Sequence, residues 1–212
     1  MTHDPKSGPQ PVVVDYGAGN LRSVVRALSA LGYEPTVTNE PADVLAAPVV
    51  ILPGVGAAGQ IMSSLRQLEL DDAIRQVIDK RKPFLGVCMG MQVLMDRSDE
   101  DGGQECLGVF SGSVARFETD LKIPNMGWNS VRQQVCHPVW DDIPNDTYFY
   151  FVHSYAVRPS DNAITLATTD YDGAFPSAIG RDNVFGTQFH PEKSGAHGLR
   201  IYRNFMQWAA QW

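Results

Sequence analysis

Cysteine is scarce in this sequence, and its few residues form no recognisable pair. The 212 residues contain three cysteines, Cys88, Cys106 and Cys136, none of them in a Cys-x-x-Cys motif. A disulfide-stapled secreted domain would show an even set of cysteines, and a structural zinc site would show ligand pairs at short spacing. We therefore expect free thiols and a reducing, cytoplasmic environment.

An excess of positive charge and a long apolar run are also missing. Lys and Arg number 17 against 24 Asp and Glu, a formal net charge of −7. Nucleic-acid and anionic-membrane binding would normally need a basic face. No apolar stretch approaches the roughly 18–20 residues that span a bilayer. The first eleven residues, MTHDPKSGPQP, lack the apolar core of a signal peptide. We expect no nucleic-acid partner and no membrane association.

Apolar residues are plentiful enough to build a substantial core. They make up 43% of the chain against 19% charged residues, and 212 residues suit one compact domain. The sequence contains no internal repeat and no linker-like stretch that would mark a boundary. We expect a flexible N-terminal segment over residues 1–10 and one domain over 11–212.

Strand-like and helix-like patterns alternate through the first half. Continuous apolar runs predict buried strands at Val12–Val14, Val49–Leu52 and Phe84–Val87. Helical spacing lies between and after them, over Leu21–Leu31 with Gly32 as the cap, over a long stretch from Ile61 to Ile78, and from Met91 to Met95 as the start of another helix. This alternation is typical of a parallel sheet covered on both faces.

The second half is richer in strand candidates. They are Ser113–Phe117, Tyr148–Tyr155, Ile164–Thr169 and Val184–Phe189, with a turn at Arg181-Asp182-Asn183 and a closing amphipathic helix through Leu199, Tyr202, Phe205, Met206 and Ala209. The sequence thus predicts a single α/β domain, with a mostly parallel central sheet flanked by helices and an antiparallel strand section.

The sharpest local motif is Gly86-x-Cys88-x-Gly90, which follows the apolar strand that starts at Phe84. Such a strand-to-turn-to-helix sequence is typical of a nucleophile elbow, with cysteine as the nucleophile. Glycines on both sides of Cys88 are needed because Cβ atoms would collide in so sharp a turn. The elbow would place the sulfur at the carboxyl end of the sheet and at a helix N-terminus, which favours the thiolate.

A base and a residue that orients it are expected in His190-Pro191-Glu192, directly after the last strand. In an extended chain, side chains two positions apart point the same way, and Pro191 stiffens the link. His190 would act as the base and Glu192 would fix its tautomer. His153, within an apolar strand, is interpreted as a hydrogen-bonded core histidine.

Cofactor and metal signatures are absent. Gly17-x-Gly19 invites a dinucleotide interpretation, but the third glycine position is Arg22, and no Gly-x-x-x-x-Gly-Lys motif occurs. No metal-ligand spacing such as His-Glu-x-x-His occurs either. We expect neither cofactor nor metal. Pro53-Gly54-Val55-Gly56 is a tight turn whose backbone N–H groups can face a ligand beside the elbow.

These motifs together resemble a family. Gly86-x-Cys88-x-Gly90-x-Gln92, followed far downstream by His190-Pro191-Glu192, resembles the class I (triad) glutamine amidotransferases. Four stretches are similar to one branch of it, the glutaminase subunits of imidazole glycerol phosphate synthases: Asp15–Leu21, Pro53–Gly56, Pro124–Asn129 and Phe151–Tyr155. One departure is Asn125, where many members carry His, and we expect it to leave the chemistry untouched.

The resemblance implies a reaction and a binding site. Cys88 would attack the side-chain carboxamide of L-glutamine, and His190 and Glu192 would serve as base and orienting acid. The backbone N–H of Met89 and one from the Gly54-Val55-Gly56 segment would hold the oxyanion. Glutamine itself would be positioned by Gly56, Gln92, Ser154 and Tyr155. The glycines that flank Val55 allow a peptide flip, so we hypothesise that the Val55 N–H points away from the oxyanion hole at rest.

A partner is also implied. The branch works with a separate (β/α)₈-barrel cyclase subunit, which would form a heterodimer with this chain and use the ammonia to make imidazole glycerol phosphate in histidine biosynthesis. Asn20, Met126, Trp128 and Asn129 would lie at the docking face. The alternatives are a glutaminase of another synthase, such as that of the anthranilate or pyridoxal phosphate pathway, and a non-catalytic binding module of the same fold. A cysteine peptidase would leave Pro53-Gly54-Val55-Gly56 unexplained.

Overall fold

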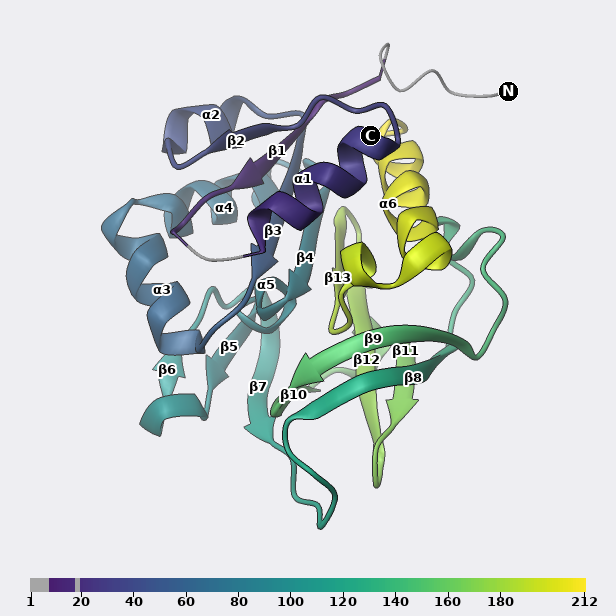
Figure 1. The fold of residues 1–212 in the computed structure, drawn as a ribbon. Coiled ribbons are helices and arrows are strands. Elements are labelled where there is room, and N and C mark those ends of the chain that lie inside the picture. The colour runs from purple at the N-terminus through teal and green to yellow at the C-terminus, as the bar shows by residue number, and fades with distance from the viewer. Residues whose placement is uncertain (1–7, 18–19) are drawn as a thin grey trace.

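A central mixed sheet organises the molecule (Figure 1). A computed structural model describes residues 8–17 and 20–212, so the segment expected to be flexible lies outside the described residues over 1–7. Within the described ranges, the sheet has nine strands in the order β2-β1-β3-β4-β13-β12-β11-β8-β9. A smaller four-stranded sheet, β10-β7-β5-β6, lies beside it.

The first five strands of this order are parallel and form the buried half of the sheet. They are β1 (Pro11–Val14), β2 (Thr36–Thr38), β3 (Val49–Gly54), β4 (Phe84–Cys88) and β13 (Val184–Thr187). Every residue of β1, β3, β4 and β13 is buried, as expected for strands covered on both faces. The carboxyl ends of β3, β4 and β13 meet at one edge, which is where an open sheet of this kind binds its ligand.

The rest of the large sheet is antiparallel, as is most of the smaller one. The large sheet adds β8 (Asn125–Gln133), β9 (Thr147–His153), β11 (Thr165–Asp170) and β12 (Ala174–Arg181). The smaller sheet contains β5 (Met95–Ser98), β6 (Gln104–Glu105), β7 (Phe110–Arg116) and β10 (Tyr155–Pro159). The predicted fold class is therefore confirmed, with an antiparallel section as large as the parallel one.

Helices cover both faces of the parallel half (Figure 1). They are α1 (Leu21–Ala30), α2 (Pro41–Ala46), α3 (Ala58–Gln67), α4 (Leu70–Asp79), α5 (Met89–Gln92) and α6 (Gly195–Ala209). Short 3₁₀ turns occupy Glu100–Gly102, Pro138–Trp140, Asn162–Ile164 and Pro191–Lys193. Helix α1 packs against α6, while α4 packs against α2 and α3.

Two helix predictions need correction. The stretch from Ile61 to Ile78 is two helices, because Glu69 adopts a left-handed conformation with φ of 56° and interrupts the backbone between α3 and α4. The helix expected from Met91 to Met95 is a single turn that starts at Met89, and Met95 already begins strand β5. The apolar residues of this segment are buried in the core below the elbow. Their spacing therefore reflects burial and not a continuing helix.

Strand boundaries also shift in the second half. The predicted strand Tyr148–Tyr155 is divided at Ser154, where the chain leaves β9 and enters β10 of the other sheet. The predicted strand Val184–Phe189 ends at Thr187. The closing helix is confirmed as α6. Several elements lack a clear apolar pattern and were missed: β2, α2, β5, β6, β8 and β12.

Candidate active site

The elbow around Cys88 forms where β4 meets α5. Cys88 has φ of 55° and ψ of −109°, a strained combination for a residue with a side chain, and it is only 3% exposed. A Cβ on Gly86 would lie 2.5 Å from the Gly90 carbonyl oxygen, and a Cβ on Gly90 would lie 2.0 Å from the Leu52 carbonyl oxygen on β3. The glycines are therefore required by close backbone contacts, both within the elbow and with the neighbouring strand.

The helix after the elbow is shorter than the sequence predicts, so it stabilises a negative charge on Cys88 less than expected. Helix α5 has four residues, Met89–Gln92, so its aligned peptide dipoles are few. The expectation that a helix N-terminus favours the Cys88 thiolate is therefore weakened. The positive charge available to the sulfur comes instead from a histidine.

That histidine is His190, which the end of β13 brings to Cys88. Its Nδ1 lies 2.7 Å from Glu192 Oε1, and the side chains of both residues are at most 1% exposed. Its other ring nitrogen, Nε2, is buried without a hydrogen-bond partner. The spacing expected for an extended His-Pro-Glu link is thus realised, although Pro191 and Glu192 form a 3₁₀ turn.

The Glu192 carboxylate is anchored by two further side chains from distant parts of the chain. The Asn20 amide, just before α1, donates to Oε1, and the Tyr202 hydroxyl, on α6, donates to Oε2 at 3.2 Å. Because most of the sequence lies between Asn20 and Tyr202, no local pattern could reveal Tyr202 as a partner. Asn20 is also predicted at a docking face, and its side-chain amide is hydrogen-bonded to this carboxylate.

Electrostatics favour a charged pair of His190 and Glu192. Burial lowers the pKa of His190, but the negative charges of Cys88 and Glu192 outweigh burial and raise it to about 10. Burial would raise the pKa of Glu192, but the hydrogen bond and charge of His190 hold it below the usual value. The arrangement can therefore supply a protonated imidazole beside a negatively charged sulfur.

A cavity of about 360 Å³ opens beside Cys88. Most residues predicted for oxyanion and glutamine binding line it together with Cys88 and His190, namely Val55, Gly56, Met89, Gln92, Ser154 and Tyr155. Gly54 does not line it, because this residue packs against the elbow, where a Cβ would lie 2.3 Å from Gly90 N. Glu192 lies behind His190.

Glu100 and His153 also line this cavity, and the sequence pointed to neither as a binding residue. The Glu100 carboxylate accepts a hydrogen bond from Ala58 N at 2.8 Å, and burial raises its pKa. His153 Nδ1 donates to the Tyr155 carbonyl oxygen at 2.8 Å, and burial lowers the pKa of His153 to about 4, so the ring is neutral. His153 is the hydrogen-bonded histidine that was expected, but it borders the cavity.

The Val55 N–H is engaged by a side-chain hydroxyl. It donates to the Tyr16 hydroxyl at 3.3 Å. Burial, and to a lesser extent Cys88, raise the pKa of Tyr16 well above its usual value, so the hydroxyl stays neutral and accepts. This contact agrees with the hypothesis that the Val55 peptide points away from the oxyanion position at rest.

The remaining predicted docking residues divide between the two faces of β8. Met126 and Trp128 are 62% and 53% exposed, beside Tyr148 at 61%. Asn129 is half-buried and donates to the buried Asn125 at 3.0 Å on the opposite face of the strand.

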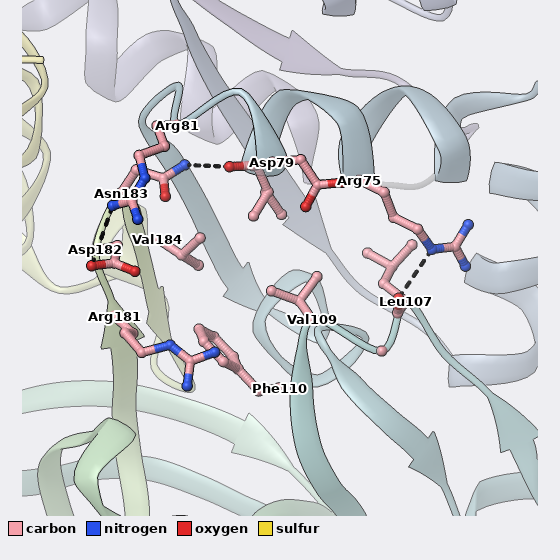
Figure 2. A pocket seen from close by; sticks show the side chains of 12 residues that line it. Arg75, Asp79, Arg81, Leu107, Val109, Phe110, Arg181, Asp182, Asn183 and Val184 are labelled. Atoms are coloured by element: carbon pink, nitrogen blue, oxygen red, sulfur yellow. Dashed lines mark hydrogen bonds and ion pairs between the residues drawn. The ribbon is translucent and has the colours of Figure 1, made fainter.

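A second, larger cavity of about 450 Å³ lies at the other end of β4 and β13 (Figure 2). Its three arginines are engaged by neighbours: Arg75 by carboxylates of α4, Arg81 by Asp182 at 3.4 Å, and Arg181 by the Phe110 ring at 5.3 Å. None of the described residues that line it is a cysteine, serine or histidine. The cavity beside Cys88 is therefore the candidate active site.

Comparison with known proteins agrees with this geometry. The profile of the family described as "Glutamine amidotransferase class-I" matches residues 12–208. The chain belongs to this family. "Imidazole glycerol phosphate synthase subunit HisH" from Dehalococcoides mccartyi (strain CBDB1) is 50% identical over 93% of this chain and 96% of its own. The protein of the same name from Herpetosiphon aurantiacus is 49% identical over 93% of each chain.

Solved structures of more distant proteins share the fold. The "Structure of PurLQS from Thermotoga maritima" superposes with a TM-score of 0.75 at 18% identity, over 95% of this chain and 99% of that one. The described residues contain no group of three or more His, Cys, Asp or Glu side chains that could hold a metal ion. No described helix is long and apolar enough to cross a membrane.

The two buried histidines of this amidotransferase should titrate on opposite sides of neutrality. The pKa of His190, at about 10, lies above the ordinary 6.5, so its contribution to the free energy of unfolding is complete below pH 6.5 and is lost as pH rises through 10. The pKa of His153, at about 4, lies below 6.5, so its contribution is complete above pH 6.5 and is lost as pH falls toward 4.

Histidine-selective ¹³C NMR titration measures both transitions, and a His153→Gln variant assigns the acidic one. The same variant should flatten the fall in denaturation midpoint between pH 6.5 and pH 4. Transitions near pH 6.5 assigned to both His153 and His190 would contradict the charge assignment.

Proposed function

We propose that this chain hydrolyses L-glutamine to glutamate and ammonia and passes the ammonia to a (β/α)₈-barrel cyclase that makes imidazole glycerol phosphate. The observation that carries the proposal is the buried Cys88–His190–Glu192 arrangement at the mouth of a small cavity. The two relatives named as subunits of imidazole glycerol phosphate synthase support the choice of pathway. Three free thiols fit a cytoplasmic location.

The proposed reaction begins at the sulfur. The Cys88 thiolate attacks the side-chain carboxamide carbon of glutamine, and the carbonyl oxygen becomes an oxyanion. His190 then donates its Nε2 proton to the leaving nitrogen, so that ammonia departs and a thioester remains. Neutral His190 next removes a proton from water, which attacks the thioester and releases glutamate. Glu192 holds Nδ1 throughout and stabilises the imidazolium each time it forms.

The cavity offers complementary groups for the amino-acid end of glutamine. The Glu100 carboxylate is the acidic side chain that lines it, and it suits the α-ammonium group. The Gln92 side-chain oxygen is buried without a partner and can accept an N–H from the substrate. Backbone groups of Ser154 and Tyr155, at the turn between β9 and β10, border the same space.

The function is tested by ammonia release from glutamine, measured for the chain with and without the cyclase. Rapid release in the complex, together with imidazole glycerol phosphate formation that depends on glutamine, would support the proposal. A complex that forms the product only from added ammonium salt would refute the glutaminase role. Equal turnover with and without the cyclase would refute the coupling.

The cyclase is proposed to dock on the exposed side chains of Met126, Trp128 and Tyr148. Because Met126 pairs in register with Val152, which lines the cavity, this surface borders the proposed route of ammonia. Large apolar side chains more than half exposed are typical of interface residues.

Trp128→Ala should weaken cyclase binding by about 30-fold or more, since buried Trp anchors typically dominate such interfaces. Isothermal titration calorimetry measures the dissociation constant. Trp212→Ala is the matched control, because Trp212 is similarly exposed but follows the end of α6. Equal losses in both variants would contradict this docking surface.

Tyr16→Phe should raise the glutaminase rate of the chain without its cyclase. Without the hydroxyl, the Val55 N–H loses its partner and turns more readily toward the oxyanion. One hydrogen bond of net strength near 1 kcal/mol corresponds to about a two- to tenfold change. In the complex, the glutaminase rate of Tyr16→Phe should stay within about twofold of that of the unmodified chain. Docking of the cyclase would already have broken the hydrogen bond between Val55 N–H and the Tyr16 hydroxyl. A basal rate equal to that of the unmodified chain would contradict this role of Tyr16.

A further inference from the structure

Gln188 contacts the nucleophile Cys88 and also Gln92, and both of these residues line the cavity. The proposed chemistry gives Gln188 no role. Gln188 follows β13, two positions before His190, and is 0% exposed. Its backbone N–H donates to the Ser177 carbonyl oxygen at 2.9 Å. A carboxamide buried so completely must find its hydrogen-bond partners inside the protein.

The partners of that carboxamide are two residues of the active site. Its Oε1 accepts a hydrogen bond from Gln92 Nε2 at 2.8 Å, and its Nε2 lies 3.6 Å from Cys88 Sγ in donor geometry. The orientation is determined by the network. Gln92 Nε2 also donates to the Tyr155 carbonyl oxygen at 2.8 Å, and a carbonyl oxygen can only accept. Gln92 therefore donates from its NH₂ group to Gln188. Gln188 must accept this hydrogen bond through Oε1, which turns its own NH₂ group toward the Cys88 sulfur.

The contact with Cys88 has a consequence for the nucleophile. An N–H donor held in a dry interior stabilises a negatively charged sulfur more than a neutral one, and it restricts where the sulfur points. The His190 imidazole, whose pKa the negative charge of Cys88 raises, favours the same charged state of the sulfur. Two groups thus favour a negatively charged sulfur, the His190 imidazole by charge and the Gln188 carboxamide by its N–H.

The contact with Gln92 has a consequence for the substrate. Because both N–H bonds of Gln92 are used by Tyr155 and Gln188, its Oε1 is left as a buried acceptor without a partner, on a residue that lines the cavity. A substrate N–H group can satisfy that acceptor. Without Gln188, the Gln92 carboxamide would lose one of the two acceptors that fix its orientation.

We propose that Gln188 is a positioning residue of the glutaminase reaction, which aims the Cys88 sulfur through its N–H and the Gln92 oxygen through its carbonyl. This inference rests on the proposed function for its effect on turnover. Its effect on the sulfur is independent of glutamine and of the cyclase.

Gln188→Met keeps the length of the side chain and removes both contacts. In the complex with the cyclase, kcat for glutamine hydrolysis should fall about 10- to 100-fold, the range for a hydrogen bond to a charged group, and KM should rise. Gln188→Glu keeps an oxygen for Gln92 and loses the N–H toward Cys88. Its kcat should fall at least as far, while KM stays close to that of the unmodified chain.

A second measurement follows the sulfur directly. The time course of iodoacetamide modification of Cys88 at neutral pH, quantified by peptide mass spectrometry, should be about tenfold slower in Gln188→Met, since the lost N–H donor leaves the attacking thiolate less stabilised. Thr187→Val is the matched control. It removes the neighbouring buried hydrogen bond from Thr187 Oγ1 to the Phe189 carbonyl oxygen, and it should leave the modification curve and KM unchanged.

The outcomes separate the two proposals. An unchanged modification curve in both folded Gln188 variants, with kcat intact, would overturn the role of Gln188. A shifted curve in a complex that hydrolyses no glutamine would overturn the glutaminase function and leave the contact with the sulfur standing. Equal shifts in Thr187→Val would show that any damage to this strand end moves the sulfur, and would also overturn the specific role.

Discussion

Replacement of Cys88 by Ala should reduce glutamine hydrolysis in the complex by about 10⁴-fold or more, the loss that follows removal of a covalent nucleophile. The remaining groups, including His190, can still bind glutamine but cannot form the thioester. Ala retains a Cβ at φ of 55°, so the substitution adds no backbone strain to the elbow. Ammonia release from glutamine, coupled to glutamate dehydrogenase, measures the effect.

Two controls make the Cys88→Ala result specific. Cyclisation with added ammonium salt in place of glutamine should proceed at the normal rate, because that reaction bypasses the sulfur. Cys136→Ala removes an exposed cysteine and should leave glutamine turnover unchanged. Residual turnover within tenfold of the unmodified chain would refute Cys88 as the nucleophile.

Gly90→Ala should strongly destabilise the protein. The new Cβ would lie 2.0 Å from the Leu52 carbonyl oxygen, whereas real Cβ atoms essentially never approach within 3.0 Å. The elbow and β3 must therefore separate by about 1 Å, at a cost of about 3 kcal/mol in the free energy of unfolding. A displacement of this size at a reacting group also lowers turnover by about 100-fold.

Chemical denaturation and glutamine turnover test the Gly90 prediction together. Gly59→Ala is the matched substitution, since Gly59 lies in α3 and its Cβ would meet only the Gln104 side chain, at 3.3 Å. Ala is a better helix former than Gly by about 1 kcal/mol, so this variant should be neutral or more stable. Similar midpoints for Gly90→Ala and the unmodified chain would show that the elbow can relax without loss.

The local part of the active site could be predicted from the sequence because its residues lie close together in the chain. The Gly86-x-Cys88-x-Gly90 motif specifies a turn by sterics, and the His190-Pro191-Glu192 motif specifies a contact by spacing. The structure has the tight elbow and the contact between His190 and Glu192, although a 3₁₀ turn and not an extended link makes that contact. The buried parallel strands were equally visible, since strands covered on both faces are continuous apolar runs.

What could not be predicted depends on contacts between distant segments. Gln188 and Glu100 are recognisable as active-site residues only in the folded chain, where the end of β13 and a 3₁₀ turn lie beside the elbow. Strand β8 carries little apolar periodicity because one of its faces is exposed, as Met126 and Trp128 are. The one-turn helix α5 was overestimated because its core-facing methionines continue the helical spacing for a few residues past its end.

The anchoring of Glu192 constrains when activity can first arise during protein synthesis. The carboxylate needs both Asn20, which precedes α1, and Tyr202 on α6, which is made much later in synthesis. A nascent chain still lacking α6 would leave Tyr202 absent and the face of α1 that α6 covers exposed. Such a chain already carries Cys88 on its elbow, but Glu192, which orients His190, lacks one of its two anchoring side chains. Ammonia release would therefore begin only after α6 has been made and packed, so nascent chains that lack α6 should not consume glutamine.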